Sequence, residues 1–282
     1  MCSDTQETLE HSKRKVSKLR FEPTRYQQQM QGERLAATFC GAGNGPFIDK
    51  IVSEAWEAAQ SCSSLDEACG EIESCIKRTY AEFGQIYQHG YCPEVDLLYG
   101  VKMHDGSRLF TATGPIVNEK SDYYACGVGS YMADFLAARI YKDYLSLYQC
   151  VILAAYILFQ AKEHVDGCGG ESQIAVLRNE GGLSGMVEGN RIEAISELLK
   201  WADDATGSIL LSAANLDLSE QELRERVKTM GDMFNGLRGG KKSEIEQRER
   251  SLRLMFGMPD EQKDEFGLPM LPSDSQTSEG QQ

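Results

Sequence analysis

The chain has 282 residues, of which 41% are hydrophobic, enough for one large domain with an extension or for two small domains. Its formal net charge is −14, and no region concentrates enough Lys and Arg to offset it, so the composition argues against a nucleic-acid-binding role. The longest apolar run, 150–159, is too short to span a bilayer, and the polar start lacks the apolar core of a signal peptide.

The nine cysteines are scattered singly, without a Cys-x-x-Cys pair. An odd number of cysteines without a disulfide framework is typical of the reducing cytoplasm. The four histidines show no metal-ligand spacing, and the chain has neither a dinucleotide fingerprint nor a P-loop. We therefore expect a cytoplasmic protein that uses no metal or cofactor and binds neither membranes nor nucleic acid.

The first segments differ sharply in pattern. Residues 1–15 are polar and of mixed charge, without periodicity, and are predicted to form a flexible tail. Alternation over 16–21 predicts a half-buried strand, and the small apolar run 34–40 predicts a second strand, which the glycine-rich segment 41–43 ends.

Two helices and a block of strands follow. Asn44, with a proline in the first turn, opens one helix, and the capping box 64–67 opens the next. The alternating segments 96–104 and 108–112 flank an Asp-Gly turn and predict a hairpin, and 123–127 is predicted to be a third strand.

The second half of the chain is more helical. We expect helices from Ser130 and over 145–164, followed by a strand at 173–177. After a turn-rich break the composition becomes charged, which predicts a helical extension over 183–258, with helices at 191–201, after a capping box at 219–222, and at 241–255. The segment 259–282 is predicted to be a disordered tail.

Helix pairs separated by strand blocks predict an α+β fold over 16–182 with a C-terminal helical extension. The order suits a four-layer α–β–β–α sandwich, and the pattern alone leaves other α+β arrangements open. Within it, several segments occur in the order found in proteasome β-type subunits of the N-terminal-nucleophile (Ntn) hydrolase family, which the chain resembles over 16–177. They resemble the strand that presents a catalytic lysine (17–21), the strand end lining the substrate cleft (40–43), the central hairpin (100–112), the Gly-Ser-Gly loop (127–130) and the Asp-x-x-Ser-Gly corner (166–170).

The resemblance implies threonine-type peptidase chemistry. In that family a processed N-terminal threonine attacks an amide carbonyl, and its own amine takes the hydroxyl proton. Carried over by position, Lys18 tunes the nucleophile, the N–H of Gly43 stabilises the oxyanion, and Asp166 orients the amine. The resemblance also implies peptide substrates and a self-associating particle, either a homo-oligomer or a ring with related subunits.

The sequence departs from the family pattern at three places. The polar segment 1–17 stands where the family has the nucleophile hairpin, so the nucleophile and its supporting aspartate have no counterparts, and Val128 and Gly169 replace two serines. The chain as written is therefore predicted to be inactive. Either the true start lies upstream and supplies the nucleophile, or the protein is a pseudo-enzyme, a non-catalytic structural or interaction subunit.

Each candidate residue also has a simpler interpretation. Lys18 is alternatively a surface lysine, Gly43 the end of a strand, and Asp166 a cap on a glycine corner. Removal of Met1 would expose Cys2 as an N-terminal nucleophile, provided that the residues after it form strands. Cys168 is either a reactive thiol or a packed small residue.

Overall fold

The computed structural model describes residues 1–9, 12–22, 35–86, 93–179, 184–215, 217–232 and 235. They fall into two compact units, Met1–Ile192 and the described part of Glu193–Gln262. The helix predicted at 241–255 and the tail predicted at 259–282 lie outside the described residues. Within the described ranges, no helix combines the length and apolar composition needed to cross a bilayer.

The first unit contains an antiparallel five-stranded sheet. Its strands, in spatial order, are β4 (Leu19–Glu22), β5 (Leu35–Gly43), β6 (Val95–Met103), β7 (Gly106–Thr113) and β8 (Ile116–Lys120). Strands β5 and β6 pair from Leu35–Met103 to Gly43–Val95. Successive side chains of a strand point to opposite faces, so Phe39 packs in the core under the helices, whereas Cys40 packs in a separate cluster on the other face.

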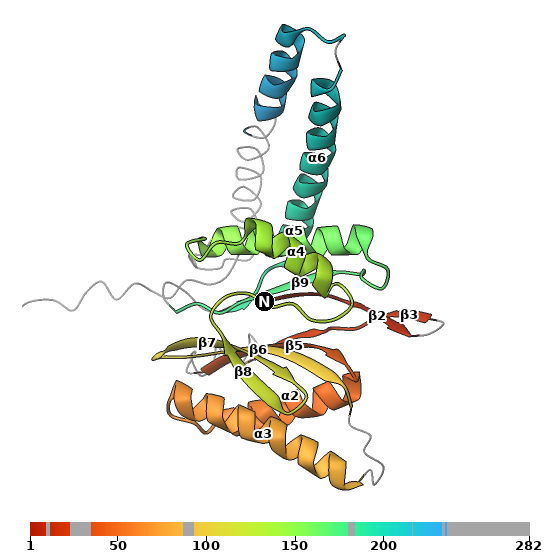
Figure 1. The fold of residues 1–282 in the computed structure, drawn as a ribbon. Helices are drawn as coiled ribbons and strands as arrows, with labels where there is room; N and C mark the ends of the chain where they lie inside the picture. The colour runs from red at the N-terminus through yellow and green to blue at the C-terminus, as the bar shows by residue number, and fades with distance from the viewer. Residues whose placement is uncertain are drawn as a thin grey trace, which may run out of the picture. The chain divides into compact units, whose positions relative to one another are not determined.

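Helices α2 (Gly45–Ala59) and α3 (Leu65–Ile86) cover one face of this sheet (Figure 1). As predicted, Asn44 caps α2, because its side-chain oxygen accepts the Phe47 N–H at 3.1 Å. The N–H of Leu65, at the start of α3, donates to Asp105 Oδ2 in the β6–β7 turn at 3.1 Å. The helix pair is thereby fixed to the hairpin beneath it.

A second sheet has the order β1 (Cys2–Asp4), β9 (Ser172–Val176) and β10 (Gly185–Met186). Helix α5 (Leu147–His164), which begins with a full capping box at Ser146, contacts β1 and β9, and α4 (Ser130–Ile140) packs on α5. Figure 1 shows the order of the layers in this unit: α2 with α3, the five-stranded sheet, the three-stranded sheet, then α4 with α5.

The structure corrects the prediction that residues 1–15 form a flexible tail. They contain β1 and a hairpin of β2 (Gln6–Leu9) and β3 (Ser12–Lys15). The Val16 N–H donates to the Thr5 carbonyl at 2.8 Å and closes the base of this hairpin. These strands are polar, so alternation of hydrophobicity did not reveal them.

The strand predicted at 123–127 is absent from the structure. The segment 121–129 is irregular, and β8 occupies the edge of the sheet instead. The reversal into β8 depends on Gly114, whose φ is +57°. Because β8 is mostly exposed, it lacks the apolar alternation that marks a half-buried strand.

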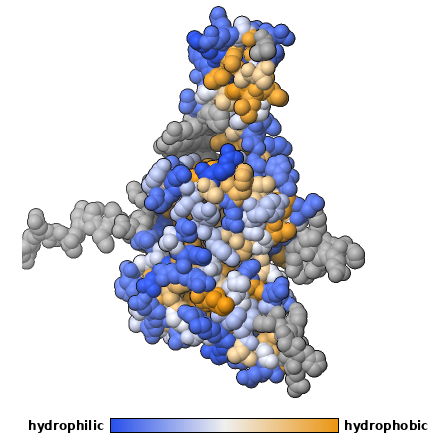
Figure 2. All heavy atoms as spheres, viewed as in Figure 1, coloured by the Kyte–Doolittle hydropathy of each residue, from blue (hydrophilic) through white to orange (hydrophobic). Residues whose placement is uncertain are grey.

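The second unit is helical. Helix α6 (Gly189–Ala213) extends beyond the predicted 191–201, and residues 220–232 form another helix. The capping box predicted at its start is present, since Ser219 Oγ accepts the Glu222 N–H at 3.3 Å and the Glu222 carboxylate accepts the Ser219 N–H at 2.9 Å. Hydrophobic side chains are exposed among polar ones on this unit (Figure 2). Leu210 and Leu211 are two large hydrophobic residues that are exposed here.

Candidate functional site

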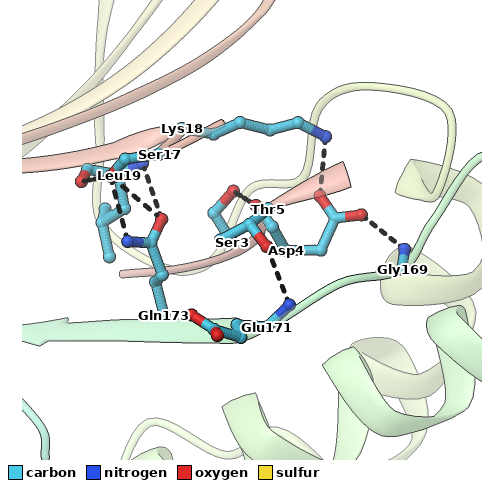
Figure 3. Close-up of polar contacts among 9 residues, drawn as sticks. All are labelled: Ser3, Asp4, Thr5, Ser17, Lys18, Leu19, Gly169, Glu171 and Gln173. Carbon is cyan, nitrogen blue, oxygen red and sulfur yellow. Dashed lines mark hydrogen bonds and ion pairs between the residues drawn. The ribbon is translucent and has the colours of Figure 1, made fainter. Parts of the chain in front are cut away.

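The candidate site lies where the end of β1 meets the residues that lead into β4 (Figure 3). Lys18 Nζ is 2.7 Å from Asp4 Oδ1, and Asp4 Oδ2 accepts the Gly169 N–H at 2.8 Å. The side chains of Lys18 and Asp4 are 27% and 12% exposed, so the ion pair is partly shielded from water. A carboxylate held by both an ammonium and a backbone N–H has little freedom to turn, and it fixes the position of the lysine.

The glycine corner after α5 fits tightly against the same end of β1. The hydroxyl of Thr5, a residue that is 2% exposed, accepts the Glu171 N–H at 2.7 Å, and the Gln6 N–H donates to the Gly169 carbonyl at 3.2 Å. Gly170 has φ of +71°, and a Cβ there would lie 2.5 Å from Thr5 Oγ1. The corner therefore requires glycine for both conformation and space.

A glutamine side chain connects the two sheets on the other side of Lys18. Gln173 on β9 accepts the Leu19 N–H through Oε1 at 3.3 Å and donates from Nε2 to Ser17 Oγ at 3.0 Å. Figure 3 shows Lys18 between this contact and Asp4. The backbone that carries the lysine is thus held on both sides.

A pocket of about 290 Å³ adjoins Lys18. It lies along β4 and β5 and is also lined by Cys40, Ile48 and Asp49. This volume is at the lower end of the range for small-molecule sites and suits one side chain of a ligand.

The structure separates the predicted site residues. Lys18 is at the centre of the network, and its carboxylate partner is Asp4, which was not among the predicted site residues. Asp166 is exposed, and its side chain makes no hydrogen bond or ion pair with the described residues. The sequence analysis found no counterpart of the family's supporting aspartate before Lys18, whereas the structure places Asp4 of that segment in contact with Lys18. The resemblance called for an acid upstream of the lysine, and a search of that segment for acids would have included Asp4.

Gly43 has a structural reason to be glycine. It pairs with Val95 at the end of β5 with φ of +115°, and a Cβ there would lie 2.1 Å from the Glu94 carbonyl oxygen. This requirement holds whether or not its N–H binds an oxyanion, so the catalytic role of Gly43 stays a prediction.

Two thiols considered from the sequence are not activated here. Burial raises the pKa of Cys2, and burial followed by the nearby Asp4 charge raises the pKa of Cys168. The strands that a Cys2 nucleophile would require do form, but a raised pKa leaves few thiolates at neutral pH. Among the described residues, no group of three or more His, Cys, Asp or Glu side chains is placed to hold a metal ion.

The sequence matches no protein-family model and no curated protein. Solved structures share its fold. Anbu from Hyphomicrobium sp. strain MC1 has a TM-score of 0.56 at 13% identity, with 73% of this chain and 90% of that chain covered. Anbu from Yersinia bercovieri, named an ancestral β-subunit, has a TM-score of 0.56 at 16% identity, with 77% of this chain and 94% of that chain covered. The Anbu complex from Pseudomonas aeruginosa, a helical assembly, has a TM-score of 0.55 at 12% identity, with 74% of this chain and 90% of that chain covered.

These comparisons correct the resemblance drawn from the sequence. The solved structures named above are Anbu proteins, and one of them is named an ancestral β-subunit. The resemblance also supposed that an N-terminal hairpin was lacking, whereas β2 and β3 form a hairpin before β4. Identities of 12–16% show a common α+β fold and nothing finer.

Proposed function

We propose that this chain is a proteasome-like subunit of threonine-type peptidase lineage, with the α–β–β–α sandwich of the Ntn hydrolases and a site organised for peptide-bond hydrolysis. The observation that carries the proposal is the Lys18–Asp4 ion pair, fixed by the Gly169 N–H. The shared fold with a protein named an ancestral β-subunit supports it.

The network suits the activation of an N-terminal nucleophile. A fixed ammonium group beside a terminal amine favours the neutral amine, the form that removes a proton from an attacking hydroxyl. Asp4 holds the ammonium of Lys18 in place, and Gln173 anchors the adjoining backbone. In this proposal the N–H of Gly43 stabilises the oxyanion, and Asp166 orients the amine during turnover.

The first residue of the printed chain does not complete this chemistry. The side chain of Met1 has no nucleophilic hydroxyl or thiol, and its amine donates to the Ala175 carbonyl at 2.8 Å. We therefore expect a form that begins at Met1 to have no peptidase activity. A form with threonine, serine or cysteine at its terminus, placed beside Lys18, is expected to be active.

Two measurements on the native protein test the proposal. Mass spectrometry of protein from its own cells identifies the terminal residue, and fluorogenic peptides measure turnover by that form and by the printed chain. Turnover confined to a form with a nucleophilic terminus, and lost in Lys18→Ala, supports the proposal. Turnover unaffected by Lys18→Ala rules out the role assigned to this residue.

A non-catalytic subunit of an assembly is the second candidate. Large hydrophobic side chains are exposed on α4 and the segments beside it, which is uncommon on a monomer. They are Val128, Tyr131, Phe135, Ile140, Tyr144, Leu147 and Tyr148. In this proposal they contact a second copy of the chain or a related subunit in the cytoplasm, and the helical extension over 183–258 is a separate part.

The assembly proposal is tested by mass measurement in solution. The double variant Tyr131→Ser, Phe135→Ser is expected to lower the particle mass, whereas Ile116→Ser, which changes an exposed residue on β8, leaves it unchanged. A monomeric wild-type chain contradicts the proposal. Turnover in the assay described above distinguishes the peptidase from the pseudo-enzyme.

A further inference from the structure

Two cysteines meet beside the Lys18 site on the face of β5 that looks away from α2. Cys40 is 7% exposed and packs with Leu19, Leu98 and Ala175. Thr38 and Ala42 flank Cys40 on the same face of the strand, because side chains alternate. Thr38 Oγ1 contacts Met1 Sδ at 3.6 Å, so the start of the chain covers one end of this face.

The irregular segment 121–129 covers the other end. A Cβ on Gly127 would lie 3.3 Å from Ala42 Cβ, and Tyr124 packs against the cluster that contains Cys40. Cys126 lies between these two contacts in the sequence, which places it beside the face of β5 that carries Cys40. Both cysteines are free thiols. We propose that Cys40 and Cys126 form a reversible disulfide when the protein meets a hydroperoxide, which fastens segment 121–129 to β5.

The surroundings assign the two thiols different roles. The interaction with Cys40 lowers the pKa of Cys126, and the positive charge of Lys18 lowers it further, against opposing effects of burial and Asp96. The same interaction, followed by burial, raises the pKa of Cys40. Cys126 is half-buried whereas Cys40 is only 7% exposed, so a peroxide reaches Cys126 first, and Cys40 then resolves the product.

The reaction balances in two steps. The Cys126 thiolate attacks one peroxide oxygen, an S–O bond forms, the O–O bond breaks, and the departing hydroxide takes a proton to become water. Cys40 then attacks the sulfenic sulfur; an S–S bond forms, the S–O bond breaks, and the released hydroxide takes the Cys40 proton. Two thiols have lost two electrons, and hydrogen peroxide has become two waters.

The crosslink bears on the site because segment 121–129 also touches the glycine corner. A Cβ on Gly129 would lie 2.9 Å from Cys168 Sγ, one residue before the glycine whose N–H binds Asp4. Gly127 has φ of +85°, so the segment turns sharply just after Cys126. A disulfide at Cys126 would restrain a segment that runs between β5 and this corner. The inference stands whether or not the chain hydrolyses peptides.

The experiment uses the full chain, reduced and then exposed to a few equivalents of hydrogen peroxide. Remaining thiols are alkylated, and non-reducing peptide mapping by mass spectrometry identifies crosslinks. We expect one crosslinked pair, Cys40 with Cys126, two hydrogens lighter than the separate peptides and reversed by a dithiol. A pair that joins Cys126 to Cys2 or Cys168, or no crosslink at all, overturns the proposal.

Variants test the order of the steps. Cys126→Ser is expected to abolish the crosslink, and Cys40→Ala to leave a sulfenic acid on Cys126 that dimedone traps. Cys69→Ser is the matched control, because this thiol is equally buried but lies in the helix-covered core, and the crosslink should persist. Lys18→Met should slow oxidation of Cys126, because the positive charge of Lys18 lowers the pKa of this thiol. Sulfenic acid on Cys40 rather than Cys126 reverses the assigned roles and contradicts the proposal.

Discussion

Asp4 and Lys18 form an ion pair at 2.7 Å although the paired strands β2 and β3 lie between them in the sequence. The hairpin returns the chain to its starting point, and the Val16 N–H bonded to the Thr5 carbonyl closes it. The site therefore depends on the geometry of β2 and β3, whose sequence is polar.

Asp4→Asn tests the contribution of this ion pair to stability. The amide keeps the shape of the side chain but leaves the partly shielded Lys18 without its counter-charge. We expect the free energy of unfolding to fall by about 1–2 kcal/mol, measured by urea denaturation. Glu73→Gln, which breaks an exposed pair with Lys77 on α3, should cost less than about 0.5 kcal/mol. Equal losses in the two variants contradict a special role for Asp4.

Thr5→Val removes the buried acceptor of the Glu171 N–H while preserving the shape of the side chain. A buried donor left without its partner costs about 1–3 kcal/mol, and we expect a loss of that size in thermal or urea unfolding. Thr206→Val in α6 is the control, since that exposed hydroxyl donates only to a carbonyl of its own helix. If Thr5→Val lowers the free energy of unfolding no more than the control does, this hydrogen bond does not hold the corner.

Gly170→Ala and Gly70→Ala are expected to change the stability of the protein in opposite directions. Gly170 has a positive φ and no room beside Thr5 Oγ1, so alanine should destabilise the protein by about 1–3 kcal/mol. Gly70 lies exposed within α3 with no atom near the added Cβ, and alanine there should stabilise by up to about 1 kcal/mol. Chemical denaturation measures both. A neutral Gly170→Ala result would show that the corner relaxes easily.

Stability at alkaline pH should depend on Cys69. Burial raises the pKa of this thiol to about 11, against 9.0 for an ordinary cysteine. Between these values the unfolded chain loses the proton and the folded chain keeps it, so the stability present below pH 9 is lost as the pH rises towards 11. Cys69→Ala removes this dependence. Between pH 8 and pH 11 the free energy of unfolding should therefore fall less in the variant than in wild type, by up to about 3 kcal/mol, as measured by denaturation at the two pH values. Parallel curves would contradict the prediction.

The elements that sequence analysis predicted well are those set by local chemistry. Asn44 caps a helix whose buried face repeats with helical period, and the Asp-Gly turn at 105–106 joins two strands with apolar alternation. Both signals are complete within a few residues, so they needed no knowledge of distant partners.

The features that sequence analysis missed depend on backbone pairing and on contacts between distant residues. Strands β1 to β3 are polar and owe their form to backbone pairing, and β8 is an exposed edge, so none of them shows a hydrophobic pattern. Lys18 was identified by position, but its partner Asp4 was not, because their contact depends on the unpredicted hairpin. The role assigned to Asp166 stays a prediction, and within the same corner it is the Gly169 N–H that contacts Asp4.

The pairing of β1 with β9 sets an order for folding. Cys2 lies opposite Ile174, so the first strand of the chain has its strand partner near the end of the first unit. Strands β5 to β8 and helices α2 and α3 pair with near neighbours in sequence and are available for folding much earlier. Contacts of long sequence separation slow folding, and chains fold as they emerge during synthesis. The Lys18 site should therefore be among the last parts to form, after the ribosome has released β9.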